Sequence, residues 1–283
     1  MKPFILSAIC IVSVIQFSCK TNQPTLVKIT DQGVNIAYTD NGTGDTTLLF
    51  VHGWCINKSY WTNQVNYFSK KYRVVTVDLP GFGQSGKNRK VWTPEAYGRD
   101  IDSAMAQLDL KNVILIGHSM AGDIVLQAAV NAPDRVIGLV GVDNFKNLGH
   151  VQTIHDKADY AQAIDSLRHH FKRLAFEYVN QALFYKTTAD SIKKRVLDDV
   201  AKADTVIAAA CLEETDFNET KQLVAAEKKL YLINSDYTPT DTTGFKTYNI
   251  PYQVFYIHAT GHFPMIEKPK EFNLLLGQII AKI

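Results

Sequence analysis

The stretch Val113-Ile-Leu-Ile-Gly-His-Ser-Met-Ala-Gly122 decides the fold of this chain. Its first four residues form a short, continuous apolar run, which predicts a strand buried on both faces of a parallel sheet. The run passes directly into Gly-His-Ser-Met-Ala-Gly, and a helical apolar pattern follows over 121–132. A serine between strand and helix occupies a sharp, strained turn that lifts its hydroxyl above the sheet. Ser119 is therefore the candidate nucleophile.

Apolar runs of the same kind recur along the chain, each bounded by Gly, Pro, Asp or Asn. They predict strands at 47–51, 74–77, 113–116, 136–142, 230–233 and 254–257. Helical stretches fall between or after them at 60–70, 94–108, 121–132 and 269–283. Strand and helix in repeated succession predict an open, mostly parallel α/β sheet flanked by helices. An earlier run at 34–38 predicts an antiparallel edge strand, with a turn at 40–42.

The succession breaks between residues 147 and 226. Apolar positions step by four and three from Tyr160 to Tyr178, which predicts one face of a long amphipathic helix, and 192–200 suggests a second. An all-helical block between the strands at 136–142 and 230–233, which are strands 6 and 7 of the expected fold, predicts a cap over the carboxyl edge of the sheet, where open α/β sheets bind ligands. A helical decoration away from the site is the alternative.

Three segments carry a resemblance to one family. The serine turn resembles the G-x-S-x-G elbow of α/β hydrolases, with Ala121 at the second glycine position and Gly122 following. Residues 48–54 (Leu-Leu-Phe-Val-His-Gly-Trp) resemble the family's oxyanion loop, and 78–85 (Asp-Leu-Pro-Gly-Phe-Gly-Gln-Ser) resemble its D-x-P-G-x-G-x-S segment. The chain is identified as a member of the α/β-hydrolase family, of the serine-hydrolase type. The resemblance implies a core over 19–146 and 227–283 and a helical cap over 147–226.

The resemblance also implies an oxyanion hole. The backbone N–H groups of Trp54 and Met120 would hold the negative charge that develops during acyl transfer, and each such donor is worth roughly 3–4 kcal/mol. The Trp54 side chain would face the pocket and limit the acyl group. His52, by the same resemblance, shapes the loop, and Asp78 is structural.

The expected base lies near the C-terminus. Residues 256–264, Tyr-Ile-His-Ala-Thr-Gly-His-Phe-Pro, with Glu267 and Pro269 resemble the family's G-H-x-x-x-x-E-x-P loop. This assigns His262 and not His258, since only His262 follows the glycine that lets the loop fold over the serine. A histidine suits the role because its ordinary pKa lies near 6.5, so it can take and return a proton near neutral pH.

The acid is placed by chain order, which in this fold runs serine, acid, histidine. Asp236 is the first choice because it follows the strand at 230–233, where the family commonly carries its acid. Asn234 replaces the usual glycine there, and the spacing to the aspartate is one residue short. Asp143, at the end of the preceding strand, and Asp241, further along the loop, are the alternatives.

Composition and charge exclude several classes of function. The chain has 283 residues, 46% of them hydrophobic, and a formal net charge of +2. Its basic clusters are short and lack interleaved aromatic residues, so nucleic acid is not an expected partner. No paired His or Cys spacing suggests a metal site, and we expect no cofactor. Cys55 and Cys211 are expected as free buried thiols, with a disulfide as the alternative.

The first residues predict a targeting segment. Met1-Lys2 is a short basic start, and the almost wholly apolar run 4–17 has the length of a signal-peptide core. The following Ser18-Cys19 resembles a bacterial lipoprotein signal, in which the cysteine becomes the first mature residue and carries the lipid. We therefore expect removal of 1–18, lipidation of Cys19 and a location in the cell envelope. Plain secretion, including to the periplasm, and an uncleaved anchor are the alternatives.

Together these features predict a serine hydrolase that cleaves a small carboxylic ester or related acyl substrate through an acyl-enzyme on Ser119. Family members use the same triad as lactonases, as carbon–carbon bond hydrolases and as cofactor-free haloperoxidase-like enzymes, and the fold does not choose among them. A ligand-binding protein that retains the fold without hydrolysis is the alternative from another class. The expected partner is a small acyl molecule, with membrane contact only through the N-terminal lipid. The sequence says nothing of oligomeric state.

Overall fold

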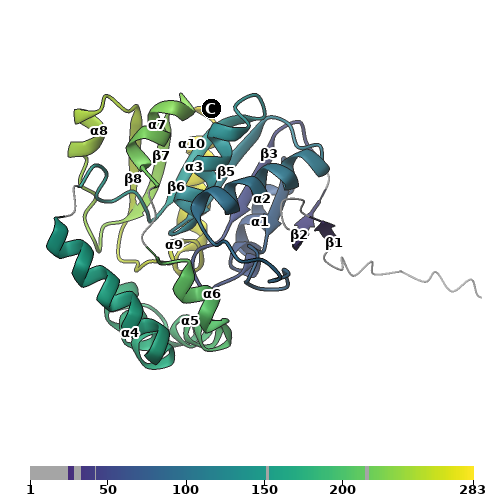
Figure 1. Ribbon diagram of the computed structural model, residues 1–283. Helices are drawn as coiled ribbons and strands as arrows, with labels where there is room; N and C mark the ends of the chain where they lie inside the picture. Colours follow the sequence, from purple (N-terminus) through teal and green to yellow (C-terminus); the bar gives the residue numbers. More distant parts are fainter. Residues whose placement is uncertain (1–24, 29–32, 42, 151–152, 214–216) are drawn as a thin grey trace, which may run out of the picture.

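The computed structural model describes residues 25–28, 33–41, 43–150, 153–213 and 217–283. The expected signal segment 1–18 and the expected lipid site Cys19 lie outside the described residues. Within the described part, one eight-stranded sheet has the order β1-β2-β4-β3-β5-β6-β7-β8 (Figure 1). The strands are β1 (Thr25–Lys28), β2 (Asn35–Asp40), β3 (Thr47–Val51), β4 (Arg73–Val77), β5 (Val113–His118), β6 (Val136–Val142), β7 (Leu230–Ser235) and β8 (Tyr252–Ile257).

The strand directions agree with the sequence. The six strands β4-β3-β5-β6-β7-β8 pair in parallel. Strand β2 runs antiparallel to β4, and β1 pairs antiparallel with β2 at the edge of the sheet. Every residue of β3 and β5 is buried, as expected of strands covered on both faces. The register places the ends of β5, β6 and β7 side by side, because His118 pairs with Val142 and Val142 with Ile233. Side chains that follow these three strands therefore meet at one edge.

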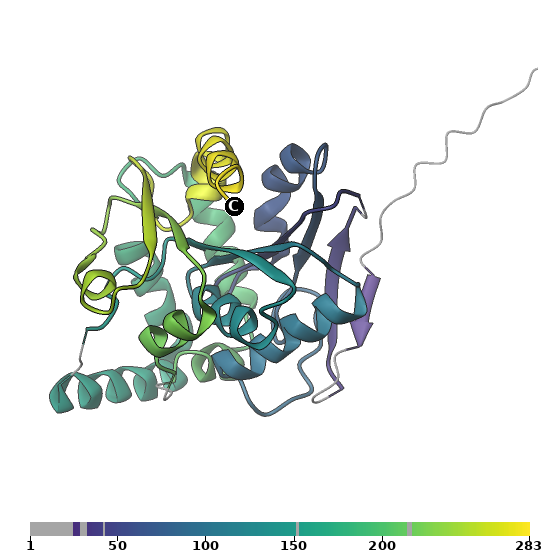
Figure 2. The ribbon, with the colours of Figure 1, turned by 90° about the horizontal axis from the view of Figure 1, so that it is seen from above.

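Helices cover both faces of the sheet. Figure 2 shows α1 and α10 on one face and α2, α3 and α7 on the other. Helix α2 begins at a capping residue, Thr93, whose hydroxyl accepts the Ala96 N–H, and Pro94 stands at its first position. These helices are α1 (Thr62–Phe68), α2 (Pro94–Gln107), α3 (Ala121–Asn131), α7 (Glu219–Ala226) and α10 (Pro269–Ile280); η1 (Lys58–Trp61), α8 (Thr243–Thr247) and α9 (Pro264–Glu267) lie in connecting segments.

The segment between β6 and β7 is helical, as the sequence predicts. Helix α4 (Ile154–Tyr178), the π-turn η2 (Val179–Leu183), α5 (Asp190–Lys202) and α6 (Thr205–Ala210) gather below the sheet in Figure 1. The buried residues of α4 are Ile164, Leu167, Phe171 and Ala175, which follow the predicted amphipathic spacing. Helix α7, the last of the segment, packs instead against α3. Among the described residues, no helix combines the length and apolarity needed to cross a bilayer.

Candidate active site

Ser119 occupies the turn between β5 and α3. Its φ of +54° lies in the left-handed region, which non-glycine residues adopt at a cost of about 1–3 kcal/mol. The turn is held by a bond from the Ser119 N–H to the Val142 carbonyl (2.9 Å) and by one from the Gly122 N–H to the Ser119 carbonyl (2.8 Å). A side chain at Gly117 would begin only 2.4 Å from the Ala121 carbonyl oxygen. The glycine two residues before the serine is therefore required, whereas Ala121 is fully buried without difficulty.

Asn144 and Asn234 brace this turn, and the sequence did not identify them. The Asn144 side-chain amide donates to the carbonyls of Gly117 (2.9 Å) and Ser119 (3.2 Å). Asn234 donates in turn to the Asn144 carbonyl at 2.9 Å. The ends of β5, β6 and β7 are thus tied together by two amide side chains. The substitution of the usual glycine by Asn234 was the one sequence signal of this network.

His262 lies on the loop after β8, as the sequence predicts. Its backbone N–H donates to the Leu183 carbonyl at 2.8 Å, which anchors the loop to the helical segment between β6 and β7. Gly261 permits this approach, since a Cβ there would meet the same carbonyl oxygen at 2.4 Å. Glu267 accepts the N–H groups of Gly261 (3.0 Å) and Phe263 (3.3 Å) and so closes the loop.

The carboxylate that accepts a hydrogen bond from His262 is that of Asp143, the alternative acid, and not that of Asp236. The His262 Nδ1–H donates to Asp143 Oδ2 at 2.5 Å, and the Asp143 carboxylate is 4% exposed. The expectation that Asp236 holds this ring is wrong. Asp236 Oδ2 instead bonds His258 Nδ1 at 2.6 Å, and these side chains are 42% and 70% exposed. Asp241 lies elsewhere and accepts the Thr243 N–H at 2.8 Å.

The pairing of β6 with β7 explains why Asp143 rather than Asp236 contacts His262. Strands β6 and β7 are parallel neighbours, so a carboxylate after either strand reaches the same edge. Ser235, the last residue of β7, is buried, and its backbone N–H donates to Asp143 Oδ1 at 2.9 Å. The β7 end therefore supports the acid from β6, and the chain turns outward at Asp236.

The electrostatics of the pair favour an ionised acid. Burial raises the pKa of Asp143, but the hydrogen bond and charge of His262 and the ammonium of Lys146 outweigh it and lower that pKa to about 2. Burial, with the nearby His262, lowers the pKa of His118 to about 3, so this ring is neutral near pH 7. A neutral His118 must carry its proton on Nε2 to donate to the His262 carbonyl, 2.7 Å away. His118 is thus a second anchor for the loop that carries His262.

The expected oxyanion donors are placed without competing bonds. Among the described residues, the backbone N–H groups of Trp54 and Met120 form no hydrogen bond within the protein. The Trp54 indole lines the cavity, donates to the Ala208 carbonyl at 2.8 Å, and packs against the Phe171 ring with centroids 5.8 Å apart. His52 is structural, as expected: its Nδ1–H donates to the Gly53 carbonyl and its Nε2 accepts the Leu79 N–H.

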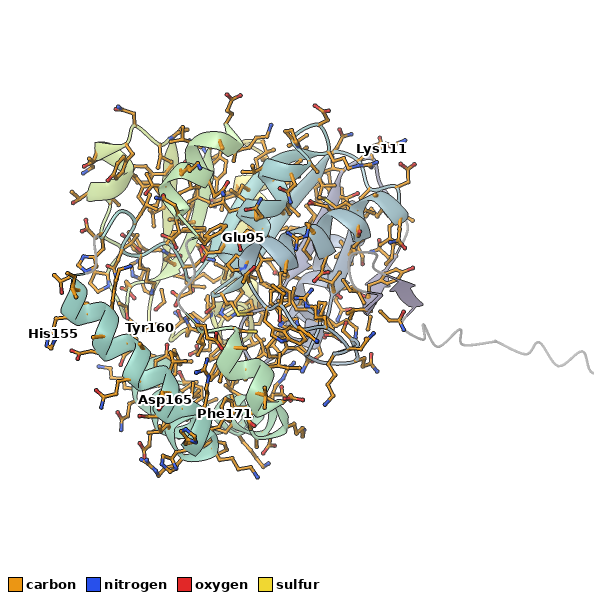
Figure 3. All side chains as sticks on the ribbon, viewed as in Figure 1. Glu95, Lys111, His155, Tyr160, Asp165 and Phe171 are labelled. Carbon is orange, nitrogen blue, oxygen red and sulfur yellow. The ribbon has the colours of Figure 1, made fainter. Side chains whose placement is uncertain are left out.

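Ser119 and His262 open into the same cavity, which has a volume of about 740 Å³. One side comes from the sheet edge, with Trp54 and Met120, and the other from the helical segment. Figure 3 shows the side chains of α4, of which Tyr160 is a labelled member of the lining. The apolar part of the lining consists mainly of Tyr160, Ile164, Leu167, Leu174, Ala175, Tyr178, Leu183, Leu212 and Phe263.

The two cysteines of the described chain are free thiols. Cys55 is buried, and burial together with the nearby Cys211 raises the pKa of its thiol. Cys211 lines the cavity and lies 3.3 Å from the Tyr97 hydroxyl. Among the described residues, neither thiol forms a hydrogen bond with His262.

Comparisons with known proteins identify the fold family. A family model described as alpha/beta hydrolase fold matches residues 46–202, a span that contains Trp54, Ser119 and Asp143. The chain belongs to the α/β-hydrolase fold family. It is 35% identical over 101 residues to a pimeloyl-[acyl-carrier protein] methyl ester esterase of Edwardsiella ictaluri, which is 36% of this chain and 37% of that protein. It is 36% identical over 110 residues to a non-heme chloroperoxidase of Streptomyces lividans, 38% of this chain and 40% of the relative.

The chain thus spans about two fifths of the length of these curated relatives. A solved bromoperoxidase of Bacillus anthracis superposes with a TM-score of 0.78 over 92% of this chain and 100% of its own. At 23% identity this likeness shows the shared fold alone.

Proposed function

We propose that this protein is a serine hydrolase that cleaves a small carboxylic ester or related acyl compound through an acyl-enzyme on Ser119. One observation carries the proposal. The ring of His262 is held on a buried, ionised carboxylate, Asp143, and faces the cavity into which the strained Ser119 turn opens. The esterase relative from Edwardsiella ictaluri supports the reaction class.

The first half of the reaction follows from the hydrogen bonds. The bond to Asp143 keeps the His262 proton on Nδ1, so Nε2 is free to accept the proton of Ser119 as its oxygen attacks the carbonyl carbon. This step requires Nε2 to come within hydrogen-bonding distance of the Ser119 hydroxyl when substrate binds; such bonds are often long in ligand-free sites. The amides of Trp54 and Met120 would stabilise the negative oxygen of the tetrahedral intermediate.

The second half repeats the proton transfers with water. His262 returns its proton to the leaving alcohol, which departs as the acyl-enzyme forms. The same ring then takes a proton from water, whose oxygen attacks the acyl carbon, and returns that proton to the Ser119 oxygen as the acid is released. Asp143 remains ionised throughout and stabilises the imidazolium in both steps.

The apolar cavity lining favours substrates with an uncharged hydrocarbon group. Leu167, Leu174 and Leu183 from the helical segment line the space opposite Ser119. Each buried methylene of a substrate placed there would contribute roughly 0.8 kcal/mol. A volume of about 740 Å³ accommodates a small-molecule ester within the usual range for ligand pockets.

Active-site labelling tests the proposal directly. A fluorophosphonate transfers its phosphonyl group to an activated serine, which intact mass spectrometry detects as one added group. We expect one adduct, located on Ser119, and none in Ser119→Ala. The proposal would be contradicted if the folded protein stayed unlabelled and hydrolysed none of a panel of acyl esters. That result would favour a binding protein that retains the fold.

A second candidate is cofactor-free haloperoxidase-like chemistry on the same residues. The supporting observation is the chloroperoxidase relative from Streptomyces lividans, which matches this chain at 36% identity over 110 residues. In that reaction hydrogen peroxide replaces water in attacking the acyl-enzyme, and a peracid leaves in place of the acid. Halogenation that depends on both a carboxylic acid and peroxide, and is lost in Ser119→Ala, would support this candidate.

A further inference from the structure

Lys146 contacts the carboxylate that holds the base. It lies three residues after Asp143 on the loop that follows β6, and its Nζ is 2.8 Å from Asp143 Oδ1. The ammonium also donates to the Ser235 carbonyl at 3.3 Å. With its side chain 14% exposed, Lys146 is held in place and largely shielded from solvent. An exposed ion pair would contribute little, but shielding strengthens the interaction.

The two oxygens of Asp143 have different partners. Oδ2 accepts the His262 proton, and Oδ1 accepts both the Ser235 N–H and the Lys146 ammonium. This division holds the plane of the carboxylate, because a rotation about the Cβ–Cγ bond would lengthen the hydrogen bonds on both oxygens at once. Lys146 therefore orients the acid toward His262.

Lys146 also brings a positive charge to the proton-transfer pair. Carboxylates near His262 include Glu267, which accepts the N–H groups on either side of this residue, and Asp123 and Glu213, which line the same cavity. Two further titratable groups, His118 at the end of β5 and Tyr178 at the end of α4, interact with Asp143 or His262. Burial lowers the pKa of His118 to about 3 and raises the pKa of Tyr178, so both are neutral near pH 7. Lys146 is thus a cation held directly against Asp143, and its charge opposes protonation of His262 across that carboxylate.

We propose that Lys146 is a positioning residue that also tunes the base: it fixes the Asp143 carboxylate and, by its charge, keeps His262 unprotonated at lower pH. The role rests on the proposed function, since a base that must accept the Ser119 proton works only while its ring is neutral. Without this lysine, Asp143 would stabilise the imidazolium more strongly, and the site would need a higher pH to operate.

Charge-removing variants provide the kinetic test. In Lys146→Met and Lys146→Gln, we expect the acid limb of the kcat/KM profile for a short acyl ester to move up by about one pH unit. Lys146→Arg keeps the charge and should keep the limb near its original position. Lys111→Met is the matched control, because this 71% exposed lysine lies just before β5, at the opposite end of that strand from Ser119. If the acid limb moves as far in Lys146→Arg as in the Met and Gln variants, the charge of Lys146 does not tune His262, and the inference is overturned.

A second measurement does not depend on turnover. The titration of the His262 ring is followed by nitrogen-15 NMR, with the resonance assigned by its loss in His262→Gln. The Met and Gln variants should raise the midpoint by about one pH unit, and the Arg and Lys111 variants should not. Unchanged midpoints in folded Met and Gln variants would overturn the inference even if the enzyme is active. A raised midpoint in a protein without hydrolase activity would support the inference and reject the proposed function.

Discussion

Replacing Asp143 by Asn tests the acid that the structure places on His262. The carboxylate accepts three donors: the His262 Nδ1–H, the Ser235 N–H at 2.9 Å and the Lys146 ammonium at 2.8 Å. An asparagine has one acceptor oxygen and one donor amide in the same space. If the oxygen stays with Ser235 and Lys146, the amide faces His262 and forces Nδ1 to become an acceptor. The ring proton then moves to Nε2, which can no longer take the proton of Ser119.

The magnitude follows from the loss of the reactive tautomer. Where an acid of this kind is replaced by its amide in a serine protease, kcat falls about 10⁴-fold. We expect a loss of about 10³- to 10⁴-fold here, equal to about 4–5.5 kcal/mol in the activation free energy. The opposite amide orientation would place two donors against Ser235 and Lys146 and is unfavourable, so it cannot rescue the ring.

The assay compares two matched variants. Kcat and KM for a short acyl ester are measured in Asp143→Asn and in Asp236→Asn, with circular dichroism and thermal melting as controls for folding. Asp236 bonds only the exposed ring of His258 among the titratable groups, so its variant should lie within about threefold of the parent. Near-parental turnover in folded Asp143→Asn, together with a large loss in Asp236→Asn, would refute the assignment.

Three further predictions concern other parts of the chain. In the unfolded chain His118 binds a proton below about pH 6.5, whereas in the folded protein its pKa is lowered to about 3, so the free energy of unfolding decreases as the pH falls. His118→Phe removes this group, and urea unfolding should show that the decrease between pH 7 and pH 5 is smaller by about 2 kcal/mol. Leu167→Trp should fill part of the cavity and lower kcat/KM for long-chain esters at least tenfold more than for acetate esters, and equal losses would show that Leu167 does not limit the acyl group. Labelling with a palmitate analogue should disappear in Cys19→Ala, and labelling that persists would count against lipidation at this residue.

The sequence determined those parts of the site that depend on short segments. The strained turn at Ser119, the loop ending in Trp54 and the Gly261-His262 pair each combine a strand end with the small residues that a tight turn requires. Such geometry is encoded within about ten residues, because steric limits on the backbone act locally. Apolar periodicity is also a local property, so the positions of the parallel strands along the chain and of the helical segment between β6 and β7 could be predicted from it.

Only the tertiary structure decided the acid and its partners. Asp143 and Asp236 both follow buried strands, and chain order permits either; the packing of the Ser235 N–H and of Lys146 against Asp143 selects one. The bond from Ser235 to Asp143 joins the ends of β7 and β6 across 92 residues of sequence. A periodic pattern fixes which face a residue is on, but hydrogen bonds between strand ends depend on register and side-chain rotation. That is why the candidate nucleophile and base could be predicted from the sequence, while the choice of Asp143 over Asp236 and the contact with Lys146 required the folded sheet.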